Sequence, residues 1–113
     1  FVADGDTVSV AGLNLKVIYT PGHTPGSVSY YVNGLLFSGD TLFRGSIGRT
    51  DIPYGSYKQI MDAILSKLMI LPNETIVLPG HQLETTIWQE RSTNPFILDE
   101  MKKHSGSSGV HTP

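Results

Sequence analysis

The dipeptide Asn33-Gly34 constrains the fold of this chain more than any other feature. It separates two short apolar runs, 27–32 and 35–37, and both of its residues accept the positive φ angles of a type I′ turn. This pattern predicts a β-hairpin. His23 lies just before its first strand and Asp40 lies just after its second. Because antiparallel pairing brings these two chain ends to one edge of the sheet, we expect His23 and Asp40 to lie close together.

The other elements are predicted from apolar periodicity and capping residues. Trp88 and Phe96 fall on the last two helices, where we expect them to pack rather than to form a binding platform. In chain order we expect a hairpin of strands 8–10 and 13–19, a long glycine-rich loop over 41–55, a helix that begins at Ser56 and is ended by Pro72-Asn73, a strand over 75–78, a helix capped at Thr86, and a last helix from Asn94-Pro95 to about Lys103.

Three metal-capable side chains stand beside glycine or proline at the ends of predicted strands. They are His23, Asp40 and His81. Two imidazoles and a carboxylate suit zinc, iron or manganese. For each histidine taken alone, the alternative is a ring that satisfies backbone groups in a tight loop.

Composition limits the class of protein. The chain has 113 residues with 39% hydrophobic content, which predicts one small globular unit over 1–104 and a flexible Ser/Gly-rich tail over 105–113. The net charge is −2 without a run of like charge, so we expect neither a nucleic acid nor a membrane as partner. No cysteine is present, which excludes disulfides and thiolate metal sites and is compatible with the cytoplasm. No segment reads as a membrane span or secretory signal.

The candidate ligands belong to a longer series of segments. These are TPGHTPGS at 20–27, FSGDTLF at 37–43, GSIGRTD at 45–51, PGH at 79–81 and ETT…NPF at 84–96. In order and spacing the series resembles the metallo-β-lactamase superfamily, most closely its hydroxyacylglutathione hydrolase (glyoxalase II)-like branch. The resemblance implies an α/β fold: the C-terminal half of an αββα sandwich, with antiparallel hairpins and two to three helices.

The chain departs from the family in one respect. The HxHxDH signature, which lies upstream of the TPGHT segment in the family, is absent, and none of the four histidines stands in for it: His23, His81, His104 and His111. Half of a sandwich leaves an apolar face uncovered, which predicts pairing with the missing N-terminal half or with another copy, or poor stability.

The resemblance also implies roles for the candidate ligands. The position of His23 binds a first metal ion, that of Asp40 bridges both ions as the catalytic carboxylate, and that of His81 binds the second. The complete protein would hold two divalent ions, zinc or else iron or manganese, which activate water. The remaining ligands are implied to come from the missing half. We therefore expect this chain alone to bind at most one ion weakly and to lack hydrolase activity.

The loop after Asp40 offers further candidates. Arg49 is a candidate for contacting a substrate carboxylate and Asp51 for supporting the metal site, but the two are expected rather to brace the loop as an ion pair, since both come from one short segment. Arg44 and Tyr54 are weaker substrate candidates. Thr24 is expected to hold the histidine loop through short hydrogen bonds.

The resemblance implies an enzyme that hydrolyses small-molecule thioesters such as hydroxyacylglutathione. We expect it in the cytoplasm, with which the lack of cysteine is compatible. One alternative is a persulfide dioxygenase with a single iron, which looks similar through the GRTD segment. Another is a non-catalytic module that pairs with a partner chain through its sheet edge. The metal content of the complete protein separates the two enzymes.

Overall fold

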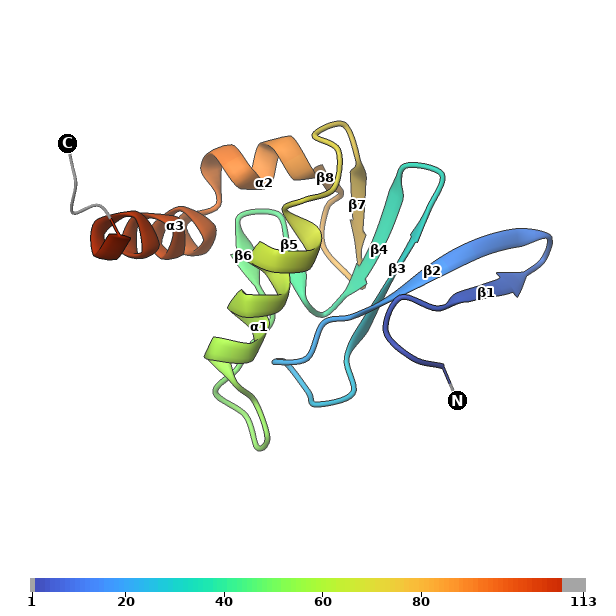
Figure 1. Ribbon diagram of the computed structural model, residues 1–113, viewed down its shortest axis with the longest axis horizontal. Helices are drawn as coiled ribbons and strands as arrows, with labels where there is room; N and C mark the ends of the chain where they lie inside the picture. The colour runs from blue at the N-terminus through green and yellow to red at the C-terminus, as the bar shows by residue number, and fades with distance from the viewer. Residues whose placement is uncertain (1, 109–113) are drawn as a thin grey trace.

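A mixed six-stranded sheet forms the centre of the computed structural model, which describes residues 2–108 (Figure 1). The strand order is β1-β2-β3-β4-β7-β8, and β4 and β7 run parallel while every other pair is antiparallel. The strands are β1 (Thr7–Val10), β2 (Leu13–Tyr19), β3 (Val28–Val32), β4 (Leu35–Gly39), β7 (Ile76–Pro79) and β8 (Thr85–Thr86).

Both predicted hairpins are confirmed. In the second, Asn33 and Gly34 have φ angles of 49° and 76°, as a type I′ turn requires, and Val32 pairs with Leu35. The β1–β2 hairpin turns in the same way at Ala11-Gly12. The predicted strand over 75–78 is also present as β7.

The prediction of a loop over 41–55 is wrong for the first part of this segment. A small antiparallel ribbon forms there from β5 (Leu42–Phe43) and β6 (Ser46–Ile47). Each strand has two residues, which is too short for an alternating pattern to be recognised. The ribbon forms because Leu42, Phe43 and Ile47 bury their side chains.

The crossover between β4 and β7 is helical. α1 (Tyr57–Ala63) begins after Ser56, whose Oγ accepts a hydrogen bond from the amide of Gln59 at 3.1 Å, as predicted. It continues as the π-helical turn η1 (Ile64–Leu68), so the helix ends before the predicted stop at Pro72-Asn73.

The last two helices begin at their predicted caps. α2 (Ile87–Thr93) is capped by Thr86, and Asn94 caps α3 (Pro95–Ser108) by accepting a hydrogen bond from the amide of Phe96 at 2.9 Å. α3 extends beyond the predicted end near Lys103. The predicted flexible tail thus begins inside this helix, and its residues 109–113 lie outside the described residues.

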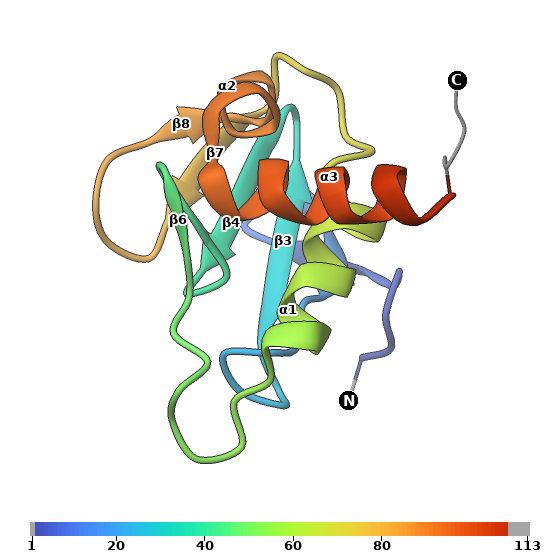
Figure 2. The same ribbon diagram turned by 90° about the vertical axis from the view of Figure 1, so that its left-hand side faces the viewer.

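The helices all lie on one face of the sheet, where they form the core (Figures 1 and 2). Trp88 and Phe96 were expected to pack there, but they are 57% and 38% exposed, because their neighbours Ile87 and Ile97 take the inward positions. No helix within residues 2–108 has the length and apolarity that crossing a membrane demands. The fully buried core side chains include Leu36, Ile60, Ile64, Leu68, Val77, Ile87 and Ile97.

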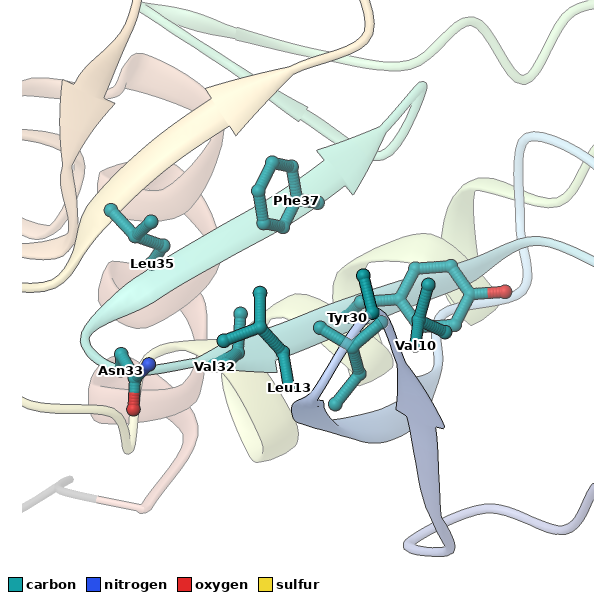
Figure 3. Close-up of a pocket in the computed structure, with 9 residues that line it drawn as sticks. Val10, Leu13, Tyr30, Val32, Asn33, Leu35 and Phe37 are labelled. Atoms are coloured by element: carbon teal, nitrogen blue, oxygen red, sulfur yellow. The ribbon is translucent and has the colours of Figure 1, made fainter.

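The opposite face of the sheet carries apolar side chains that no helix covers. Figure 3 shows Leu35, Phe37 and Tyr30 projecting from this face, with helices behind the sheet. They line a groove of about 460 Å³ together with residues of the β1–β2 hairpin. Leu13 and Phe37 are 46% and 41% exposed. The uncovered apolar face expected of a half-sandwich is therefore present.

Candidate metal centre

The three predicted ligands gather at one edge of the sheet. His23 lies in the loop before β3, while Asp40 and His81 follow the parallel strands β4 and β7. The amide of Gly80 donates to the carbonyl of Gly39 at 2.9 Å and continues the β4–β7 pairing up to these two residues. The hairpin and the parallel pair thus bring together residues that are far apart in sequence.

Asp40 stands between the two histidines. His23 Nε2 is 3.7 Å from Asp40 Oδ2, and His81 Nδ1 is 3.4 Å from Asp40 Oδ1. The histidines therefore face different oxygens of one carboxylate. The His23 side chain is 23% exposed, whereas those of Asp40 and His81 are 45% and 65% exposed, so the edge is open to solvent on the side of His81.

A backbone contact orients the ring of His23. Its Nδ1 lies 2.8 Å from the carbonyl oxygen of Arg49. Because a carbonyl only accepts, Nδ1 donates a proton to it, which leaves Nε2, the nitrogen on the side of Asp40, as the ring atom that could bind a metal ion. Such a contact, which holds the ring and fixes its tautomer, is typical of metal-binding histidines.

His81 is held by an aromatic contact. The ring of Phe43, in β5, lies against it with a centroid distance of 5.0 Å and an interplanar angle of 42°. Phe43 itself is buried, so it gives the exposed imidazole one rigid neighbour.

Gly48 permits the close approach of the loop to Asp40 and His23. A Cβ atom at this position would lie 1.8 Å from the carbonyl oxygen of Asp40 and 3.3 Å from the Cβ of His23. No larger residue fits without moving the backbone. The glycine of the GSIGRTD segment is thereby explained by packing.

The donor set fits a divalent ion in chemistry but not in placement. Imidazole nitrogens and a carboxylate suit zinc, iron or manganese, and Nε2 of His23 is the ring nitrogen on the side of Asp40. Within residues 2–108, however, no three histidine, aspartate or glutamate side chains form a group placed to hold an ion. His23 and His81 instead define two half-sites that share Asp40.

The predicted ion pair between Arg49 and Asp51 is present. Arg49 Nε lies 3.0 Å from Asp51 Oδ1, and this pairing raises the pKa of Arg49 and lowers that of Asp51. Both side chains are more than 70% exposed, at 72% and 76%. Asp51 therefore pairs within its own loop, as expected, and among the described residues it bonds to Arg49 rather than to the candidate ligands.

The other predicted site residues lie around the same loops. Thr24 Oγ1 lies 2.8 Å from Ser27 Oγ, which closes the histidine loop as expected. Tyr54 is 84% exposed, and Arg44 lines a separate small pocket of about 150 Å³ beside β8. In the part of the chain that the structure describes, neither residue bonds to His23, Asp40 or His81.

Sequence reasoning missed one buried acid, Glu90 in α2, whose side chain is 0% exposed. Its Oε1 accepts hydrogen bonds from the amide of Gly45 and from Asn94 Nδ2, both at 2.9 Å, and its Oε2 accepts one from Thr85 Oγ1 at 2.6 Å. An acid in a polar stretch of helix predicts a solvated side chain, so the sequence carried no signal for this cluster.

The fold is that of half of an α/β sandwich with three candidate metal ligands at one edge of its sheet. The family model described as the metallo-beta-lactamase superfamily matches residues 1–81, and the chain belongs to this superfamily.

Relatives and solved structures agree with this assignment. The hydroxyacylglutathione hydrolase GloC of Haemophilus influenzae is 39% identical over 99 residues, which cover 86% of this chain and 47% of GloC. The structure of ETHE1 from Myxococcus xanthus matches 99% of this chain and 52% of its own, with 36% identity and a TM-score of 0.83. TTHA1623 in a di-iron-bound form matches 84% of this chain and 46% of its own, with 42% identity and a TM-score of 0.74.

The chain spans about half the length of the curated relatives that it matches. The matched part corresponds to the half-sandwich described above.

Proposed function

We propose that this chain is the C-terminal part of a metal-dependent hydrolase that cleaves thioesters of the hydroxyacylglutathione type. The observation that carries the proposal is the placement of His23 and His81 against the two oxygens of Asp40 at one sheet edge. A carboxylate that serves two histidines in this way suits a pair of ions. The similarity to GloC supports the thioester as substrate.

The residues of this chain would hold and orient the ions. Divalent ions, when bound, supply an activated water and polarise the scissile carbonyl. His23 offers Nε2, since its Nδ1 donates to the carbonyl of Arg49, and Asp40 offers one oxygen to each side. Zinc is the expected metal; iron or manganese would suit the same donors.

Arg49 is the best placed of the three substrate candidates. Its carbonyl bonds to His23, while its guanidinium is 72% exposed and pairs with Asp51. An exposed guanidinium beside the metal centre can bind a carboxylate of a glutathione-type substrate. Arg44 and Tyr54 lie on neighbouring segments and would contribute more distant contacts.

The uncovered apolar face supports a second part of the proposal. Because the relatives are about twice as long as the matched region, we assign this face to the remaining half of the protein. That half would supply the missing ligands and complete the two half-sites. We place the enzyme in the cytoplasm, which fractionation of cells that produce the complete protein would test.

A persulfide dioxygenase is the second candidate. Two features favour it: the GRTD segment at 48–51, and the likeness to ETHE1 from Myxococcus xanthus. A single redox-active iron in the complete protein would support it over hydrolysis. If the apolar face pairs only with another copy of the chain, the chain would instead be a non-catalytic module.

The proposal is tested by titrating the chain with zinc and measuring the binding by calorimetry. We expect weak binding of at most one ion per chain, and loss of that binding in Asp40→Asn, because this change removes the charge shared by both half-sites. The matched control is Asp62→Asn, an exposed carboxylate in α1 that pairs with Lys58.

Activity is measured on the complete protein. Hydrolysis of a hydroxyacylglutathione thioester that is lost in Asp40→Asn supports the proposal. Zinc binding that is equal in Asp40→Asn and in the parent, or a complete protein that consumes oxygen with a persulfide and leaves the thioester intact, would overturn it.

A further inference from the structure

The β5–β6 ribbon and the loop that follows it touch all three candidate ligands. Phe43 lies against the ring of His81, Gly48 packs on the backbone of Asp40, and the carbonyl of Arg49 bonds to His23. Any movement of this segment would change the surroundings of both imidazoles. The position of the ribbon therefore matters for the centre as a whole.

The β5–β6 ribbon is not part of the main sheet. Within residues 2–108 its two strands pair with each other and not with the main sheet, and the amide of Gly48 donates to the carbonyl of Thr41 at 3.0 Å. Two residues per strand make such a ribbon unstable by itself. Contacts from elsewhere in the chain must hold it in place.

Two buried side chains near the end of α2 provide polar contacts of this kind. Glu90 Oε1 accepts from the amide of Gly45, at the tip of the ribbon, and Asn94 Nδ2 donates to the carbonyl of Ser46 at 3.1 Å. Asn94 Nδ2 also donates to Glu90 Oε1. The two side chains thus bind adjacent residues of the turn as one unit.

The side chain of Glu90 is itself held in place by several parts of the chain. It is fully buried, and its carboxylate accepts three hydrogen bonds from three different segments: the ribbon, β8 and the start of α3. A buried carboxylate is tolerated only when its oxygens are satisfied in this way. Hydrogen bonds to a charged acceptor are also stronger than neutral ones.

We propose that Glu90 is a positioning residue for the metal centre. By holding the tip of the β5–β6 ribbon it keeps Phe43 against the ring of His81, and it acts on the centre only through this ribbon. The importance of this role for catalysis rests on the proposed function, whereas the effect on His81 is independent of it.

The test observes the imidazole of His81 by NMR in the metal-free chain. Phe43→Leu gives the chemical shifts of His81 without an adjacent aromatic ring. Glu90→Met fills the same space without an acceptor, so we expect its His81 shifts to move most of the way to those of Phe43→Leu. Glu90→Gln keeps an acceptor for Gly45 and a group that can bond to Thr85, so we expect the shifts of the parent chain.

The control is Glu74→Gln, an exposed acid in the turn before β7. It should leave the shifts of His81 unchanged. A folded Glu90→Met variant with the parent shifts would overturn the proposal. If Glu90→Met does not fold, Thr85→Val removes one of the three hydrogen bonds and should move the shifts in the same direction; parent shifts in that variant would equally overturn it.

A second readout connects Glu90 to the metal. We expect Glu90→Met to weaken zinc binding on the order of tenfold and Glu90→Gln to leave it unchanged, as for residues that orient metal ligands. Zinc binding that does not change while the shifts of His81 move would overturn the link to the metal centre. Failure of the parent chain to bind zinc would count against the proposed function, while the metal-free shifts would still decide the role of Glu90.

Discussion

At the scale of single residues, the candidate centre depends on atoms that a motif does not distinguish. Arg49 appears in the sequence as a cation, yet it contributes to His23 through its backbone carbonyl. Its guanidinium is 72% exposed and pairs with Asp51. The motif therefore predicts that the residue lies at the centre, but not which of its groups acts there.

Asp4 yields a prediction about pH at this scale. Its carboxylate accepts a hydrogen bond from the amide of Tyr19 and pairs with Lys67, both of which lower its pKa. Because the folded pKa lies below the unfolded value of about 3.9, Asp4 stabilises the fold above that value, and this contribution is lost as the pH falls through the lowered pKa.

We therefore expect Asp4→Asn to reduce the free energy of unfolding at neutral pH by less than about 1 kcal/mol, since the carboxylate is 43% exposed. Urea unfolding at neutral and at strongly acidic pH measures the difference, which should vanish in acid. An equal loss of unfolding free energy at both pH values would contradict the stabilising role of the Asp4 carboxylate.

At the scale of elements, caps and turns depend on residues that are close in the sequence, whereas the β5–β6 ribbon depends on distant ones. Ser56 bonds to an amide three residues along the chain, and Thr86 does the same in α2. Such contacts can be recognised in the sequence because they depend on neighbours. The β5–β6 ribbon depends on Glu90, 45 residues away from Gly45, and was accordingly missed.

The cap of α1 gives the prediction at this scale. Ser56→Ala removes the acceptor for the amide of Gln59, so we expect the free energy of unfolding to fall by about 1 kcal/mol. Urea unfolding measures it. Ser66→Ala is the matched control, because Ser66 bonds only to a carbonyl of its own helix and its loss should change stability by less than about 0.5 kcal/mol. Equal effects of the two changes would show that the cap does not stabilise the helix.

At the scale of the whole molecule, the chain is a sheet with helices on one face only. Leu36 and Val77 are buried beneath the helices, while Leu35 and Phe37 project from the other face (Figure 3). Apolar side chains on both faces are typical of a strand that is buried on both sides, although the described part of the chain covers only one of them.

We expect the open face to bind an apolar dye and to promote self-association of the chain. The double change Leu13→Gln and Phe37→Gln should reduce both, because it places polar groups in the groove. Dye fluorescence and sedimentation velocity measure the effect. Ile70→Gln is the control, since Ile70 is 75% exposed but does not line the groove. A parent chain that binds no dye and stays monomeric would contradict the expectation.

The sequence by itself determined the two hairpins, the helix starts and the placement of His23, Asp40 and His81 at strand ends. Turn angles and caps are set by adjacent residues, and the pairing of strands follows from them. Only the tertiary structure decided that Asp40 faces one histidine with each oxygen, that Glu90 is buried, and that Trp88 is not. These features arise where segments distant in the chain pack together, and the energy of such contacts is not encoded in any local pattern of residues.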